Sequence, residues 1–382
     1  MRFSTLIIKN LLRRKTRTAL TAVGVSLSIG TMVALLGIAE GFNQSFAEVY
    51  QKRGIDMVVV QAGTADSLAS YLDERVGKLL ERLSGVNSVT PGLVDLVAFK
   101  EAGMFAVPVS GRKPDSLLSN DLKILRGRRL QVGDKQAVLL GMILAKNLGK
   151  QTGDSVAIGG QEFQVVGVYE SFSTFENGSA VMPLKELQRL KGRLHQVTGF
   201  LLVLNGSGDK SALVDSLHYK IEEMKDEQGR SLNLAAHSTQ DHVGSAMQVR
   251  IARAMALLTS IIALFIGSIG MLNTMTTAVL ERTREIAILR AIGWRKSRVI
   301  RMVLGESLLL CISGAVNGIL TAIITTRLMS SLPAVNGLLG KHIPGSVILE
   351  GFLLAILVGL IGGVSPAYRA ARLLPTEGLR HE

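Results

Sequence analysis

The sequence is poor in several residue types, and each shortage excludes a class of protein. Its 382 residues include one cysteine, Cys311, so an intrachain disulfide and a zinc cluster built on cysteine are both excluded. The six histidines are scattered and form no His-Glu-x-x-His motif, so no catalytic metal site is predicted. There is also no G-x-x-x-x-G-K-[ST] phosphate loop, and we expect these residues not to hydrolyse ATP by themselves.

Aromatic residues are few as well, at 4%, whereas apolar residues reach 47% and glycines number 40. This composition is typical of packed membrane helices. A helix needs about 20 residues to cross about 30 Å of hydrocarbon. Four nearly uncharged windows are long enough, at 19–39, 254–280, 302–326 and 347–368. The first window is longer than the apolar core of a usual signal peptide and is not followed by an Ala-x-Ala cleavage site, which favours an uncleaved signal anchor.

The formal net charge of +13 is concentrated in three short segments. Residues 1–18, 281–301 and 369–382 together hold 16 basic and four acidic residues, whereas 41–253 hold 25 basic and 23 acidic. Short cytoplasmic segments of membrane proteins collect Lys and Arg in this way, so the charge does not indicate a nucleic-acid partner.

Placing the basic segments in the cytoplasm sets the topology. We expect a bacterial cytoplasmic (inner) membrane protein with both termini in the cytoplasm. In chain order, the expected parts are a cytoplasmic amphipathic segment (1–18), a first span (19–39), an extracytoplasmic domain (40–253), a second span (254–280), a cytoplasmic helix (281–301), a third span (302–326), an outer loop (327–346), a fourth span (347–368) and a cytoplasmic tail (369–382).

The extracytoplasmic domain has the pattern of an α+β fold. Segments 57–111 and 195–238 each predict a βαβ-like half, with a β-rich insert at 112–194 between them. The apolar spacing of 67–83 predicts a helix, and Gly159-Gly160 predicts a two-residue hairpin turn. Helical stalks at 41–53 and 239–253 should continue the first two spans. The predicted fold class is membrane α-helical with four transmembrane helices, plus this extracytoplasmic α+β domain.

The segment 281–301 is the most informative stretch. In a helix, Ile286, Leu289 and Ile292 or Gly293 share one face, while Arg282, Glu285 and Arg290 point elsewhere. This pattern predicts a docking helix for a cytoplasmic partner. A basic patch lying on anionic lipid is the alternative, although a lipid-facing helix has little use for Glu281 and Glu285.

Two further features belong to the spans. Glu306 is expected near the inner interface, paired with Arg298 or Arg301, and a gating role is the alternative. The GxxxG pairs Gly314 with Gly318 and Gly359 with Gly363 predict close helix packing, within or between subunits.

Several segments resemble those of a known family. ERTREIAILRAIGWRKSRVIR, from Glu281 to Arg301, is similar to the coupling-helix signature of the MacB/FtsX-type, or type VII, ABC permeases. The tail SPAYRAARLLPTEGLR, from Ser365 to Arg380, resembles that family's ending. Residues 138–148, Gly153-Asp154 and 163–168 resemble the outer domain of MacB-like members. With one span before the outer domain and three after it, the resemblance covers essentially the whole chain, without a fused ATPase domain.

This resemblance implies a non-catalytic permease subunit that passes ATPase movements to its outer domain, a mode called mechanotransmission. ATP and Mg would be bound by two copies of a partner ATPase, with no cofactor in this chain. A second permease copy, identical or paralogous, and the lipid bilayer are implied partners, and a periplasmic adaptor and outer-membrane channel are further ones that the family allows. The implied ATPase-coupling residues are Glu281, Arg282, Arg284, Glu285, Ile286, Leu289, Arg290 and Gly293.

The expected function is export or extraction of a hydrophobic or membrane-associated substrate, driven by a separate ATPase. The spans hold few ionisable groups, which argues against a polar passage through the bilayer. A lipoprotein-releasing permease of the LolC/LolE kind is one alternative. Another is an FtsX-like regulator that transports nothing and activates an extracytoplasmic cell-wall hydrolase, although the outer domain of such regulators is usually smaller than 40–253.

Overall fold

The computed structural model describes residues 15–64, 67–99, 102–206, 208–330 and 343–373. The chain divides into two compact units. The helical unit contains 1–40, 252–328 and 341–382, and the sheet unit contains 41–251 and 329–340. The start of the predicted N-terminal segment, most of the predicted outer loop and the end of the predicted tail lie outside the described residues.

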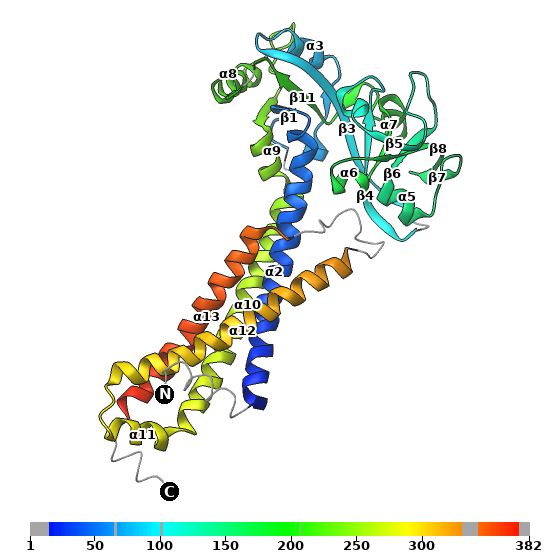
Figure 1. The fold of residues 1–382 in the computed structure, drawn as a ribbon. Helices are drawn as coiled ribbons and strands as arrows, with labels where there is room; N and C mark the ends of the chain where they lie inside the picture. The colour runs from blue at the N-terminus through cyan, green and yellow to red at the C-terminus, as the bar shows by residue number, and fades with distance from the viewer. Residues whose placement is uncertain (1–14, 65–66, 100–101, 207, 331–342, 374–382) are drawn as a thin grey trace. The chain divides into compact units, whose positions relative to one another are not determined.

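Four long helices carry the predicted spans (Figure 1). They are α2 (Lys15–Gln51), α10 (Met247–Leu280), α12 (Lys296–Met329) and α13 (Gly345–Arg372). Each is long and apolar enough to cross a membrane, and each contains one of the four predicted windows. A short helix, α11 (Thr283–Ala291), lies between α10 and α12. The predicted arrangement of one span, a folded domain and three further spans is confirmed.

Small side chains let the long helices approach closely. Apolar residues of all four form one buried cluster, including Ile29, Met271, Ala315 and Ala355. A Cβ atom added to Gly318 of α12 would lie 2.6 Å from the carbonyl oxygen of Ser26 in α2. Large apolar side chains also cover the outside, with Phe265 69% exposed. Such a surface suits lipid rather than water.

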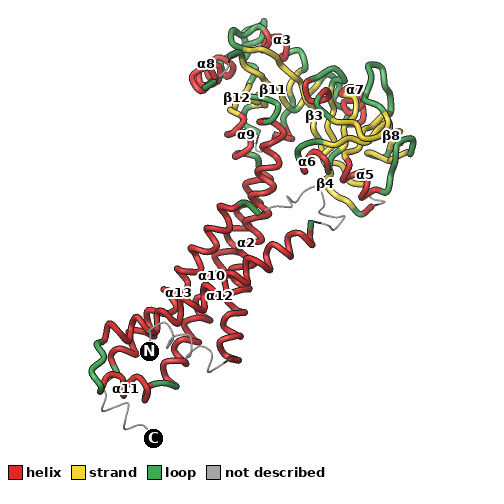
Figure 2. The backbone as a smooth tube through the Cα atoms, in the orientation of Figure 1, coloured by secondary structure: helices red, strands yellow, loops and turns green. Residues whose placement is uncertain are grey.

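The sheet unit is built around one ten-stranded mixed sheet, whose strands Figure 2 shows in yellow. Its strands are β1 (Met57–Gln61), β3 (Val86–Phe99), β4 (Met104–Arg112), β5 (Lys123–Gly127), β6 (Ala137–Gly141), β7 (Ser155–Ile158), β8 (Gln161–Glu170), β9 (Ala180–Pro183), β11 (Gly199–Leu204) and β12 (Leu234–Ser238). A separate pair joins β2 (Leu72–Asp73) and β10 (Gln196–Val197). The helices are η1 (Ser67–Ala69), α3 (Val76–Glu81), α4 (Leu117–Asn120), α5 (Met142–Leu148), α6 (Thr174–Asn177), α7 (Leu184–Leu190), α8 (Ser211–Glu222) and α9 (Thr239–Ser245).

The two predicted βαβ-like halves are present, but they interleave. The strand order β12-β1-β11-β3 places β11 between β1 and β3 of the first half and β1 between β11 and β12 of the second. Each neighbouring pair is antiparallel. The result is a split βαβ arrangement. The sheet continues through β4, β9, β6, β8 and β5, so the predicted insert extends the same sheet.

Local turn predictions had mixed outcomes. The hairpin at Gly159-Gly160 is confirmed, because Ile158 pairs with Gln161 across an antiparallel β7–β8 ladder. The prediction of a continuous helix over 67–83 is wrong. Leu72 and Asp73 pair with β10 instead, and the Asp73 carboxylate accepts the backbone N–H of Arg75 at 2.8 Å. A side chain that bonds the backbone in this way competes with a helix, which starts only at Val76.

Residues on both faces of the sheet are buried. Met57 and Val59 of β1 belong to the main core with residues of α3 and α8. Val58 and Val60, on the opposite face, pack with Tyr50 of α2. The C-terminal end of α2 is therefore part of the sheet unit.

Close packing at Gly318 is testable with a matched pair of substitutions. In both Gly318→Ala and Gly24→Ala, alanine improves helix propensity by about 1 kcal/mol. The two variants differ in what the new Cβ contacts. At position 318 it would collide with backbone atoms of α2, whereas at position 24 no atom lies within 4 Å. Overpacking typically costs ~1–3 kcal/mol. We expect a lower thermal unfolding midpoint of the full chain in detergent for Gly318→Ala and no decrease for Gly24→Ala. Equal midpoints would contradict the close contact.

Candidate functional site

The first candidate site is the connection between α10 and α12. Its helix α11 has Glu285 in the first turn and Arg290 in the last, charges that complement the helix dipole. Arg290 also donates to the carbonyl oxygen of Trp294 at 3.0 Å. The helix ends before Gly293, whose φ of 99° lies in the left-handed region that glycine adopts without strain.

One face of α11 is buried within the helical unit. Ile286 is 2% exposed and Ala287 is fully buried. They pack with residues of α12 and α13, among them Met302 and Ala370, and Leu289 packs against the same cluster. Ile286 was predicted to belong to an apolar docking ridge; in the structure its side chain is buried in the core of this chain.

The opposite face of α11 is open. We call Arg284, Glu285 and Ile288 of α11, together with Ile292 directly after it, the docking face; all four are exposed, although Ile292 was predicted to share a face with Ile286. Ile288 is 42% exposed and Ile292 is 75% exposed. Two apolar side chains beside two of opposite charge form a surface that suits a protein partner.

An ion pair fixes α11 to the third long helix. Arg282 Nη1 lies 3.0 and 3.1 Å from the two carboxylate oxygens of Glu306 in α12, and Arg282 Nε lies 3.2 Å from Glu285. The Glu306 side chain is 6% exposed. The predicted partners of Glu306 were Arg298 and Arg301, and the structure supplies Arg282 instead. Arg298 stacks on the Trp294 ring at 4.4 Å, and Arg301 donates to the carbonyl oxygen of Ser297.

The remaining predicted residues lie at contacts inside the helical unit. Glu281 forms an ion pair with Arg17 of α2. Gly314 and Gly318 lie against α2. Gly359 and Gly363 of α13 lie against Cys311 and Ser307 of α12.

The second candidate site is in the sheet unit and was not predicted. We call Arg53, Arg112, Asp121 and Glu176 the arginine–glutamate cluster. The Glu176 carboxylate accepts from Arg53 Nη2 at 2.8 Å, from Arg112 Nη2 at 2.5 Å and from the Ser171 hydroxyl. Arg53 also donates to Asp121 at 2.6 and 3.1 Å. The side chains of Arg53 and Glu176 are each 2% exposed.

Burial and charge act in opposite directions on Glu176. Burial raises the pKa of its carboxyl, but the charges of Arg112 and Arg53 and hydrogen bonds from Arg53 and Ser171 outweigh this and lower the pKa to about 2. The carboxylate is therefore ionised at any physiological pH. Burial works against the Arg53 charge as well, but Glu176 and Asp121 together raise the pKa of its guanidinium.

The cluster attaches the end of α2 to α6. The Ser173 hydroxyl donates to the carbonyl oxygen of Ser45 at 2.7 Å, and the Ser45 hydroxyl accepts the Phe175 N–H at 3.0 Å. The Phe175 ring packs edge-on against Phe42 and Phe46 of α2. The sequence offers little signal for this site, because the ion pairs of Arg53 join residues 68 and 123 positions apart.

Two family models match the sequence. The MacB-like periplasmic core domain matches residues 18–218, and the FtsX-like permease C-terminal model matches residues 257–375.

Similar proteins extend over the chain at low identity. An uncharacterized ABC transporter permease of Methanocaldococcus jannaschii, MJ1507, is 23% identical over 99% of this chain and 97% of its own length. The uncharacterized permease YknZ of Bacillus subtilis is 24% identical over 98% of both chains. The macrolide export ATP-binding/permease protein MacB of Escherichia coli is 25% identical over 98% of this chain, which spans 60% of that protein.

Two solved structures resemble part of the chain. They are the periplasmic region of MacB from Actinobacillus actinomycetemcomitans and the extracellular domain of YknZ from Gram-positive bacteria. Both have 16% identity and a TM-score of 0.37, and they cover 50% and 48% of this chain and 92% and 98% of their own.

The arginine–glutamate cluster predicts a large effect of Glu176→Gln. Removing one buried charge leaves Arg53 and Arg112 without their shared counter-ion, a change that typically costs ~3–5 kcal/mol. Glu170→Gln removes an exposed pair with Lys123 and should cost less than about 1 kcal/mol. Chemical unfolding of the full chain measures both.

The same variant has a pH signature. A carboxyl whose folded pKa is about 2, below its ordinary 4.5, contributes stability that is present above pH 4.5 and is lost as the pH falls toward 2. The wild-type chain should lose stability over that window more steeply than Glu176→Gln. Parallel pH profiles would show that the cluster does not hold Glu176 ionised.

Proposed function

Because the chain belongs to the MacB/FtsX type of ABC transporter permeases, we propose that it couples ATP hydrolysis in a separate ATPase subunit to movements of its sheet unit. The near full-length similarity to MJ1507 and YknZ, both described as permeases, supports this role. The lack of a phosphate loop in these residues supports a separate source of ATP hydrolysis. The chain is an inner-membrane protein, and we place its termini in the cytoplasm because the three basic segments then share that side.

The observation that carries the proposal is that α11 is buried on one face and exposed on the other. Its inner face is anchored by Ile286, Ala287 and the Arg282–Glu306 pair. Its docking face is left exposed. A helix held in this way moves as a unit with α12 and α13 when a partner pushes on its open side.

The ion pairs and α2 offer a path for that movement. Glu281 connects the start of the α10–α12 connection to Arg17 of α2. The same helix α2 contributes residues 41–51 to the sheet unit. There the arginine–glutamate cluster attaches its C-terminal end to α6. We infer that α2 transmits displacement to the sheet unit.

We further propose that the transporter exports or extracts a hydrophobic or membrane-associated substrate outside the bilayer centre. Among the described residues of the four long helices, Glu306 is the buried acidic or basic side chain, and Arg282 neutralises it. The other buried polar side chains of these helices, such as Ser260, Ser307 and Thr326, are uncharged, and apolar residues and close glycine contacts surround them. These features favour transmission of movement over a polar passage. By analogy with the family, two permease chains and two ATPase subunits form the complex.

The docking face can be tested at Ile292. Ile292→Glu places a charge in the proposed interface, while Ile292→Leu keeps its apolar character. We expect an ABC ATPase to co-purify with the tagged wild-type chain and with Ile292→Leu from the native host, and about tenfold less with Ile292→Glu. A substitution of Glu285 would be harder to interpret, because it would also remove the contact of Glu285 with Arg282.

The same experiment has an internal control for folding. Trp294 is the single tryptophan and lies just beyond α11. Fluorine NMR of 5-fluorotryptophan chains should show an unchanged free-state signal in both variants and a shift on ATPase addition in Ile292→Leu alone. Equal ATPase recovery with Ile292→Glu and Ile292→Leu would remove the docking assignment.

The joint between α2 and α6 is predicted to be rigid. The Ser45 and Ser173 hydroxyl oxygens lie 3.3 Å apart, so cysteines at both positions are within reach of a disulfide. The native Cys311 is buried and does not compete. We expect the oxidised double variant to keep the ATPase activity of the reduced one in the reconstituted complex. Loss of activity on oxidation and recovery on reduction would instead identify a hinge here.

A further inference from the structure

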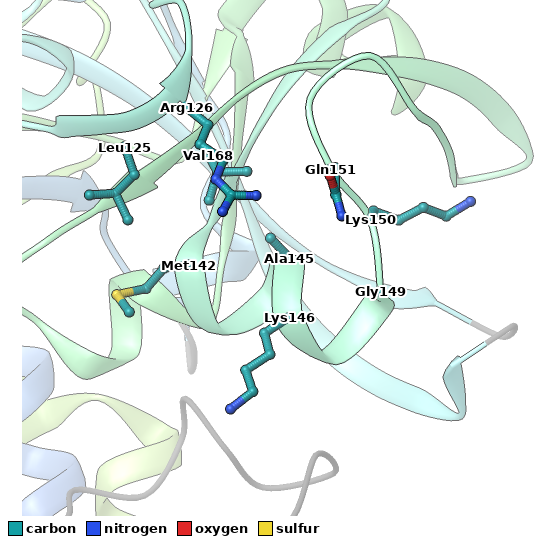
Figure 3. Close-up of a pocket in the computed structure, with 9 residues that line it drawn as sticks. All are labelled: Leu125, Arg126, Met142, Ala145, Lys146, Gly149, Lys150, Gln151 and Val168. Atoms are coloured by element: carbon teal, nitrogen blue, oxygen red, sulfur yellow. The ribbon is translucent and has the colours of Figure 1, made fainter.

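A cavity of about 400 Å³ opens on the sheet unit between β5, β8 and α5, in the range of ligand pockets (Figure 3). It is lined by Leu125, Arg126, Met142, Ala145, Lys146, Gly149, Lys150, Gln151 and Val168. Leu125 and Met142 are exposed large apolar residues, at 43% and 39%.

A β-bulge explains why two consecutive residues of β5 line the cavity. In a regular strand, neighbouring side chains point to opposite faces. Here the β5–β8 register shifts between Ile124 and Arg126, which leaves Leu125 as the extra residue. Leu125 and Arg126 then line the same hollow, at the edge strand of the sheet. Bulges often direct a side chain in this way at binding sites.

One face of α5 forms the opposite wall. Met142, Ala145, Lys146 and Gly149 follow the spacing of a single helical face. Gly149 ends the helix in the left-handed conformation, with φ of 64°. The backbone N–H groups of Gly149 and Lys150 donate to the carbonyl oxygens of Lys146 and Ala145, which satisfies these two carbonyls near the end of α5.

The charged side chains that line this cavity are all cationic. Arg126, Lys146 and Lys150 line it, no acidic residue does, and none of the three makes a side-chain hydrogen bond or ion pair within the described part of the chain. Nearby cations behave differently. Lys123 pairs with Glu170 at 2.8 Å, and Arg128 pairs with Asp134 at 2.7 Å. In Figure 3 the Arg126 guanidinium lies over the hollow, while the two lysine ammonium groups point outward at its rim.

We propose that this cavity binds an anionic amphiphile, a ligand with one phosphate or carboxylate head and an apolar chain. The Arg126 guanidinium pairs with the head group, and charge-assisted hydrogen bonds to an anion are the strong ones. Leu125, Met142 and Val168 contact the apolar chain. The lysines at the rim raise the local concentration of anions. A cationic or neutral amphiphile would lack the favourable ion pair with Arg126.

The cavity assigns a class of ligand to the sheet unit. That this ligand is the transported cargo rests on the proposed function. The same chemistry has two sources, a free amphiphile in solution and the head group of a membrane lipid. Binding is measured without any ATPase, so a failure at this cavity leaves the docking face untouched. Conversely, loss of the ATPase interaction leaves this measurement valid.

The experiment uses the full chain in phosphatidylcholine nanodiscs and a diazirine-bearing dodecyl phosphate as the photoprobe. We expect labelling of peptides within 125–151, competed by dodecyl phosphate and not by dodecyltrimethylammonium. Arg126→Gln should reduce this labelling about tenfold. Arg128→Gln, two positions away and paired with Asp134, should leave it unchanged. Thermal unfolding midpoints equal to wild type establish that both variants are folded.

A second arm distinguishes the source of the ligand. Nanodiscs that contain phosphatidylglycerol with a diazirine acyl chain should label the same peptides if the head group of a bilayer lipid occupies the cavity; labelling by the soluble probe alone identifies a free amphiphile. Labelling elsewhere in the chain, equal competition by the cation, or equal labelling of Arg126→Gln and wild type would each overturn the proposal.

Discussion

The sheet unit depends on one buried carboxylate, that of Glu176, and on the two arginines that neutralise it. Arg53 follows α2, Arg112 ends β4 and Glu176 lies in α6, so each charge comes from a different element. A buried charge without a partner is costly, whereas the paired group is tolerated. The three elements must therefore come together for any of the three charges to be buried. This requirement attaches the end of α2 to the region that was predicted as an insert.

The helical unit applies the same physical rule to α11. The Glu306 side chain of α12 is 6% exposed, and Arg282 neutralises it from the start of α11. Glycines such as Gly318 let the long helices pack at backbone distance, where larger residues would hold them apart. Both ends of α2 thus meet an ion pair, Arg17 with Glu281 at one end and Arg53 with Glu176 at the other. These paired ends suit a helix that passes displacement along the chain.

Two surfaces remain on which large apolar side chains are exposed. On the docking face, Ile288 and Ile292 are exposed while the apolar residues behind them are buried. At the cavity of the sheet unit, exposed Leu125 and Met142 lie beside Arg126. The two differ in charge, since the docking face mixes both signs and the cavity carries cations alone. Their chemistry therefore suits different partners, a protein at the first and an anionic amphiphile at the second.

Hydropathy, charge placement and local turn chemistry were enough to predict the four long helices, the βαβ connections and the Gly159-Gly160 hairpin. These features follow from short-range periodicity, which is written directly in the order of residues. Only the tertiary structure decided that the two halves interleave, that Ile286 faces the core of this chain, that Arg282 pairs with Glu306, and that Leu72 and Asp73 form a strand. It also brought Arg53, Arg112 and Glu176 together. Contacts between residues far apart in the sequence have no fixed spacing, so the physical chemistry that selects them acts only once the chain has folded.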